Sequence, residues 1–210
     1  MAERGASADR LVRHALVDRL FHWLMAACVL VLLGTAFLPI MGLDFPWVAA
    51  HWIAGFILTA IVVFHTVRAA FWQDLKSMWI GGADLRAAID TAAYSLRLSG
   101  RLPVNSGKYS FAQKLIHHLF TLVLLVAIVT GLLMMVRIDT PWWDRNPFWL
   151  AQATWGVVYV LHGLAALSLI TMIICHIYFA LRPEKRLFMR AMILGWIRRE
   201  EYRNYHDDRR

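Results

Sequence analysis

The chain has 210 residues, of which 60% are hydrophobic, and its formal net charge is +8. Because a water-soluble domain usually has about 45–50% apolar residues, this composition excludes an ordinary soluble fold. A basic chain can bind nucleic acid, but no soluble basic module with interleaved aromatic residues is present, so we expect no nucleic acid partner.

Four apolar runs follow one another along the chain. They cover residues 20–40, 48–72, 115–136 and roughly 155–181. Apolar runs of about twenty residues are typical of helices that span a lipid bilayer. No Pro/Gly-rich linker or internal repeat divides the sequence, so residues 1–210 are expected to form one domain. The pattern predicts an all-α integral membrane protein, a bundle of four transmembrane helices.

Lysine and arginine are sorted between the connecting segments. Four lie before the first run, six in residues 73–114 and nine after Leu181. Residues 41–47 contain none, and residues 138–154 contain only Arg145. Positive residues gather on the cytoplasmic side of membrane proteins. We therefore expect both termini and the middle loop to be cytoplasmic.

The second outer segment is rich in aromatic residues. Residues 141–155 read PWWDRNPFWLAQATW, in which two prolines interrupt regular structure. Tryptophan favours the membrane interface. We expect a short interfacial helix or loop here, which with the short outer loops is a candidate surface for docking a partner.

The apolar runs contain almost no Asp or Glu but several histidines, and ionisable residues within a membrane mark functional sites. His162 and His176 are fourteen residues apart, which is about 1400° of helix rotation and about 21 Å of rise. They therefore share one helix face, near opposite membrane surfaces. By the predicted topology, His51 lies at the depth of His162 and His22 at the depth of His176.

Two opposed imidazoles at one depth can ligate a haem iron from both faces, and helical bundles build cofactor sites from facing helices. The spacing predicts two such haems, not covalently attached because Cys-x-x-Cys-His is absent. Gly34, Gly55, Gly131 and Gly163 would give a porphyrin room, or only permit close helix packing. His65 is also fourteen residues after His51, so helix geometry allows it to replace His22 at the inner haem.

Five motifs carry a family resemblance. They are DRLFHW (18–23), AHWIAG (50–55), GKYSFAQK (107–114), YVLHGLAA (159–166) and CHIYFA (175–180). In this order they resemble the gamma (cytochrome b) subunit of membrane-bound respiratory formate dehydrogenases, within the four-helix di-haem cytochrome b superfamily. The resemblance covers nearly the whole chain and implies a multi-pass protein of the bacterial cytoplasmic (inner) membrane.

The resemblance also implies roles for individual residues. His22, His51, His162 and His176 match the axial haem ligands, which favours His22 over His65. A quinone, menaquinone or ubiquinone, would bind near the cytoplasmic haem by the stretch GKYSFAQK, where Ser110 and Gln113 are candidate contacts.

The quinone stretch departs from the family pattern. Ser110 stands where the family commonly has Asn, and Ala112 where it commonly has Gly. Gln113, Lys108 and the pair His117–His118 are possible replacements for the missing contacts, or ordinary polar residues at the start of a helix.

These features predict a membrane electron-transfer subunit with two b-type haems and no substrate-oxidising site of its own. Electrons would pass from an iron–sulfur subunit, with its catalytic oxidoreductase subunit, on the outer face to quinone near the cytoplasmic face. Alternatives are the cytochrome b anchor of another molybdenum oxidoreductase or a nickel–iron hydrogenase, a stand-alone di-haem quinol or superoxide oxidoreductase, and a haem-free anchor or transporter.

Overall fold

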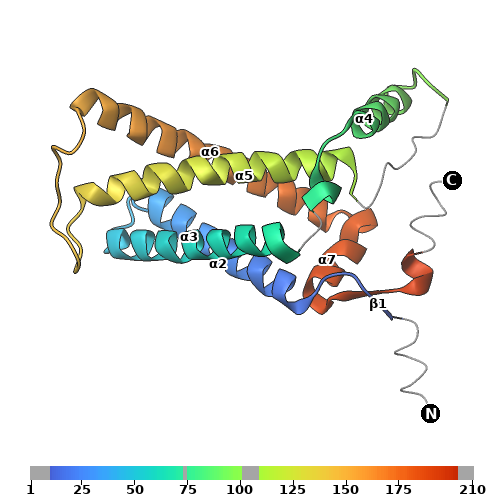
Figure 1. The fold of residues 1–210 in the computed structure, drawn as a ribbon, viewed down its shortest axis with the longest axis horizontal. Helices are drawn as coiled ribbons and strands as arrows, with labels where there is room; N and C mark the ends of the chain where they lie inside the picture. Colours follow the sequence, from blue (N-terminus) through green and yellow to red (C-terminus); the bar gives the residue numbers. More distant parts are fainter. Residues whose placement is uncertain (1–9, 73–74, 101–108, 203–210) are drawn as a thin grey trace, which may run out of the picture. The chain divides into compact units, whose positions relative to one another are not determined.

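The structure is a computed structural model that describes residues 10–72, 75–100 and 109–202, and four long helices dominate it (Figure 1). They are α2 (Leu16–Phe37), α3 (Trp47–Trp72), α5 (Phe111–Met134) and α6 (Gln152–Leu181). Each is long and apolar enough to cross a membrane, α5 together with the 3-10 turn η2 (Met135–Arg137). The prediction of an all-α membrane protein with four spanning helices is confirmed.

The helix ends lie within four residues of the predicted spans. The largest differences are at the first turns of α2 and α5, which extend the helices into polar sequence. At its other end α2 stops at Phe37, two residues before Pro39. Proline disfavours helical backbone at the residue before it, so the apolar run outlasts the helix.

Two compact units emerge from the contacts within the chain. The four-helix unit consists of Phe21–Val67 and Leu119–His176. The second unit consists of the described parts of Met1–Leu20, Arg68–His118 and Ile177–Arg210.

The four-helix unit has a small internal core. Its buried apolar side chains are Val29, Ala54, Leu58, Met135, Trp155, Val158, Ala165 and Leu169. Only 11–17% of the most apolar stretch of each long helix is buried inside the protein, so most of its apolar surface faces outward. Such a surface suits lipid, because a helix that is hydrophobic all round is stable only in a bilayer or a large core.

The segment that joins η2 to α6 is a loop, one of the two forms expected for it. The indole N–H of Trp143 in the loop donates to the carbonyl of Met135 (3.1 Å), and the indole N–H of Trp155 in α6 donates to the loop carbonyl of Pro147 (3.1 Å). Trp155 is only 1% exposed. These bonds hold the loop against the ends of α5 and α6 in the four-helix unit.

The second unit joins the N-terminal segment to the C-terminal one, which the sequence did not predict. Strand β1 (Arg10–Val12) pairs antiparallel with β2 (Trp196–Arg198). The helix α7 (Arg186–Leu194) precedes β2 and ends at Gly195, whose φ of 88° favours glycine. The Gly195 carbonyl accepts from the backbone N–H groups of Arg13 (2.9 Å) and His14 (3.1 Å).

The middle loop contributes two further elements to the second unit. They are the 3-10 turn η1 (Leu75–Met78) and the helix α4 (Gly82–Ser95). A short 3-10 turn, η3 (Pro183–Lys185), links α6 to α7.

Candidate haem-binding site

Two histidine pairs come together in the four-helix unit. His51 of α3 and His162 of α6 have ring centroids 6.3 Å apart, with 69° between the ring planes. His22 of α2 and His176 of α6 have centroids 6.4 Å apart, with 54° between the planes. These are the two pairs that the sequence places at matching depths, and they are named after their expected depths: His51–His162 is the outer pair and His22–His176 the inner pair.

The separations fit a metal ion between each pair of rings. A metal–imidazole bond is about 2 Å long, and the ring centre lies about 1 Å further back, so opposed ligands have centroids about 6 Å apart. Ligation leaves the angle between the planes open, because each ring can turn about its own metal–nitrogen bond. Aromatic side chains in simple contact have similar separations, about 4.5–7 Å. The repetition of the spacing in two pairs on a shared helix favours the ligand interpretation.

Other aromatic rings border both pairs. Trp47 lies edge-on to His51 with centroids 6.2 Å apart, and Phe120 of α5 lies edge-on to His176 at 6.1 Å. The inner pair therefore contacts three helices, α2, α5 and α6. An apolar surround of this kind keeps water from a haem iron and is one of the means by which a protein sets its reduction potential.

His65 has a different neighbour. Its ring stacks on Phe21 of α2, with centroids 4.1 Å apart and planes 19° apart. The structure thus brings His22 to His176 and places His65 against an aromatic ring. This geometry favours His22 over His65 as a ligand, in agreement with the resemblance.

Two threonines that sequence reasoning missed contact the outer pair. Thr35 Oγ1 lies 2.8 Å from Nδ1 of His51, and Thr130 Oγ1 lies 2.9 Å from Nδ1 of His162. No sequence pattern distinguishes them from Thr59 or Thr171, which also sit in apolar helices and bond a carbonyl one turn back. Only the packing of α2 on α3 and of α5 on α6 reveals them.

Of the four glycines expected to make room for a porphyrin, Gly131 has the closest neighbour. A Cβ at Gly131 would lie 3.2 Å from Cε1 of His162. At Gly34 and Gly55 a Cβ would meet leucine methyls at 3.8 and 3.9 Å, and at Gly163 it would meet nothing within 4 Å. Gly131 therefore admits the His162 ring itself, while open space adjoins Gly163.

We expect Gly131→Ala to weaken the outer site. The added methyl must push the His162 ring by a few tenths of an ångström, and overpacking of this kind typically costs about 1–3 kcal/mol. The measurement is the haem content of the purified protein, resolved into its two components by redox titration. Gly156→Ala is the matched control on α6, because a Cβ there meets nothing within 4 Å. Equal haem binding in both variants would contradict this role for Gly131.

The two candidate quinone contacts bond each other at the start of α5. The Gln113 side-chain oxygen accepts from the backbone N–H of Ser110 (2.9 Å) and from its hydroxyl (3.2 Å). The Ser110 hydroxyl lies 3.4 Å from the backbone N–H of Gln113. This arrangement is a capping box, which satisfies N–H groups that a helix start leaves without partners. Lys108 lies outside the described residues.

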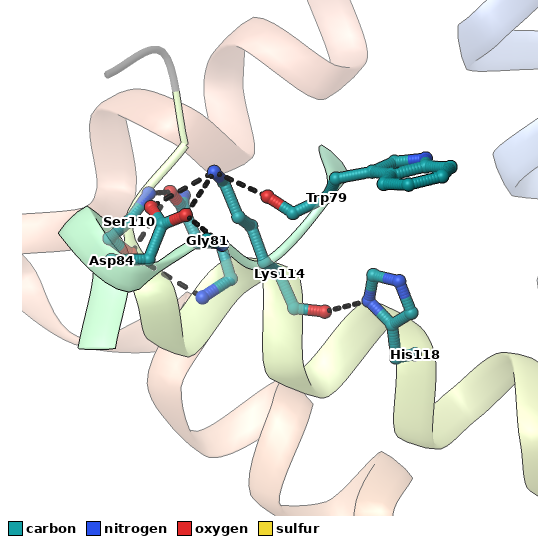
Figure 2. A network of polar contacts seen from close by, with 7 residues as sticks. Trp79, Gly81, Asp84, Ser110, Lys114 and His118 are labelled. Atoms are coloured by element: carbon teal, nitrogen blue, oxygen red, sulfur yellow. Dashed lines mark hydrogen bonds and ion pairs between the residues drawn. The ribbon is translucent and has the colours of Figure 1, made fainter. Parts of the chain in front are cut away.

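A buried ion pair in the second unit joins α4 to α5 (Figure 2). Lys114 Nζ lies 2.9 Å from both carboxylate oxygens of Asp84 and 3.0 Å from the carbonyl of Trp79. Asp84 also accepts from the backbone N–H of Gly81 at 2.9 Å. The side chains of Lys114 and Asp84 are 8% and 7% exposed. The His118 ring, another candidate, uses Nδ1 to bond the Lys114 carbonyl at 2.7 Å.

Comparison with known proteins identifies the family of the chain. The sequence profile of the family described as prokaryotic cytochrome b561 matches residues 13–195. The formate dehydrogenase cytochrome b556 subunit of Haemophilus influenzae is 22% identical over 209 residues, with 90% of this chain and 77% of that protein covered. The formate dehydrogenase cytochrome b556(fdo) subunit of Escherichia coli K12 is 23% identical over 217 residues, with 94% and 90% covered.

The family match spans the four long helices and all five histidines of the candidate site. It agrees with the non-covalent haem inferred from the sequence. The chain belongs to the prokaryotic cytochrome b561 family and is a multi-pass membrane cytochrome b of electron transfer.

Proposed function

We propose that the chain is the membrane electron-transfer subunit of a respiratory oxidoreductase and holds two b-type haems. His51 and His162 would ligate the outer haem, and His22 and His176 the inner one. The observation that carries this proposal is the presence of two histidine pairs with ring separations of 6.3 and 6.4 Å. Each haem would supply one-electron chemistry, and a histidine on each side of its iron would leave no open position for oxygen.

The helices would determine the path of the electrons. His162 and His176 both belong to α6, so one rigid element fixes the distance between the two sites at about 21 Å along its axis. Electrons would enter at the outer pair and leave from the inner pair to quinone at the cytoplasmic side. The quinone site would lie by the stretch GKYSFAQK, as the resemblance implies, with Ser110 and Gln113 as candidate contacts.

The proposed orientation has cytoplasmic termini. Its first support is the distribution of lysine and arginine. The pairing of β1 with β2 independently supports a common side for the two terminal segments, because segments joined in one ladder must lie on the same side of the membrane, while the charge distribution alone indicates which side that is. An even number of spans meets that condition.

The outer face would receive the iron–sulfur partner. Ile40 and Met41 in one outer loop and Phe148 in the other are 79%, 77% and 86% exposed. Both of these relatives are named as subunits of formate dehydrogenase, which makes an iron–sulfur subunit and a catalytic formate-oxidising subunit the partners that we propose. The complex would be a formate dehydrogenase of the bacterial inner membrane.

Purification from native membranes tests the proposal. We expect a tagged chain to yield two b-type haems per polypeptide in a pyridine haemochrome assay and to bring the two partner subunits with it. Formate should then reduce both haems, and added quinone should reoxidise them. A purified chain without a b-type absorption band would refute the haem assignment. A lone cytochrome that oxidises quinol or reduces superoxide without partners would refute the subunit assignment.

A further inference from the structure

Two buried threonine hydroxyls contact the outer histidine pair and no part of the function described above uses them. Thr35 is 7% exposed and Thr130 is 5% exposed, in helices whose surface is otherwise mostly open to lipid. Their Oγ1 atoms lie 2.8 and 2.9 Å from Nδ1 of His51 and of His162. The two ligands of the outer site therefore share one type of neighbour.

The threonine hydroxyl protons have other acceptors. Thr35 Oγ1 lies 2.7 Å from the Val31 carbonyl and 3.0 Å from the Leu32 carbonyl, both on its own helix. A carbonyl oxygen can only accept, so the single hydroxyl proton is directed there. The lone pairs of Oγ1 then face the imidazole, and Nδ1–H of His51 must be the donor.

The second threonine repeats the arrangement on α5. Thr130 Oγ1 lies 2.6 Å from the Val126 carbonyl and 3.2 Å from the Ala127 carbonyl. By the same reasoning, Nδ1–H of His162 donates to Thr130. Gly131, the next residue, leaves room for the same ring, since a Cβ at this position would lie 3.2 Å from Cε1 and 3.8 Å from Nδ1 of His162.

We infer that Thr35 and Thr130 are positioning residues that fix the tautomer of the outer histidines and lower the reduction potential of the outer haem. This inference rests on the proposed function. A neutral imidazole that carries its proton on Nδ1 has its lone pair on Nε2, the atom that would bind iron. A hydrogen bond from Nδ1–H makes the ring a more basic ligand. A more basic ligand stabilises the ferric form, so the potential falls.

The inner pair has a different surround. Within residues 10–72, 75–100 and 109–202, no threonine hydroxyl bonds a ring nitrogen of His22 or His176. The threonine contacts thus act on one haem of the two. Because they lower the potential at the outer site, they favour electron flow from the outer haem to the inner one.

Valine substitutions test the inference, because valine keeps the shape of threonine and removes the hydroxyl. We expect Thr35→Val and Thr130→Val each to raise the midpoint potential of one haem in an equilibrium redox titration, and the double variant to raise it further. The potential of the second haem should stay unchanged. Thr171→Val is the matched control, since its hydroxyl bonds only the Leu167 carbonyl on an exposed face of α6.

Serine variants separate the hydroxyl from the methyl group. Thr35→Ser and Thr130→Ser should keep both the outer haem and its potential, even if a valine variant loses that haem. Unchanged potentials in a double valine variant that binds both haems would overturn the inference. Loss of the outer haem in the serine variants would also overturn the inference, because it would show that the threonine methyl groups hold the site by packing. Absence of haem from the wild-type chain would instead refute the proposed function.

Discussion

Replacing His22 with alanine should remove one of the two b-type haems, whereas replacing His65 should leave both. The His22 ring faces His176 with centroids 6.4 Å apart, and the His65 ring stacks on Phe21. An iron that loses one axial histidine loses half of its protein ligands, so its haem should dissociate during purification. A pyridine haemochrome assay gives the number of haems per polypeptide directly. We expect one in His22→Ala and two in both His65→Ala and the wild type.

The pair of variants contains its own control. Both remove an imidazole from a membrane-spanning helix, so a general loss of stability would affect them alike. In His22→Ala the outer haem should keep its wild-type potential, which would report that the four-helix unit remains folded. Addition of free imidazole should restore haem binding if the lost group is a ligand. Retention of two haems in His22→Ala, with loss of one in His65→Ala, would transfer the ligand role to His65.

The long helices follow directly from the sequence because lipid leaves a backbone few alternatives. A chain that crosses a bilayer must satisfy its hydrogen bonds internally, so an apolar run such as 48–72 becomes a helix, as observed for α3. The pairing of His51 with His162 could also be predicted, since helix rise and topology fix the depth of each ring.

Contacts between helices could not be predicted in this way. Helix geometry gives the depth of His65 but not which neighbour its ring meets, so it left His22 and His65 equivalent. Thr35 and Thr130 gave no signal, because threonine in an apolar helix commonly bonds its own backbone. The β1–β2 pairing was missed for another reason. It joins three-residue segments at opposite ends of the chain, too short for hydrophobic periodicity to indicate a strand.

Lys114→Met should destabilise the second unit strongly. The Lys114 ammonium has three oxygen neighbours within 3.0 Å, and both it and the Asp84 carboxylate are almost wholly buried. Removal of one partner leaves the other charge buried and unpaired, which typically costs about 3–5 kcal/mol. Hydrogen exchange should show faster opening of α4, while haem content stays at the wild-type level. Arg145→Met is the control, because its pair with Asp139 is about two-thirds exposed and should contribute at most about 1 kcal/mol.

The double variant Lys114→Met/Asp84→Leu distinguishes a charge effect from a packing effect. Replacement of a whole buried ion pair by apolar side chains is often close to neutral, so the double variant should be more stable than Lys114→Met alone. It should remain below the wild type, because Asp84 also accepts from the Gly81 backbone N–H and Lys114 also donates to the Trp79 carbonyl. If the two substitutions were simply additive, the buried carboxylate would not be the cause of the loss. A double variant that is more stable than Lys114→Met alone would show that the unpaired Asp84 carboxylate causes the loss, and that the ion pair stabilises the contact between α4 and the start of α5.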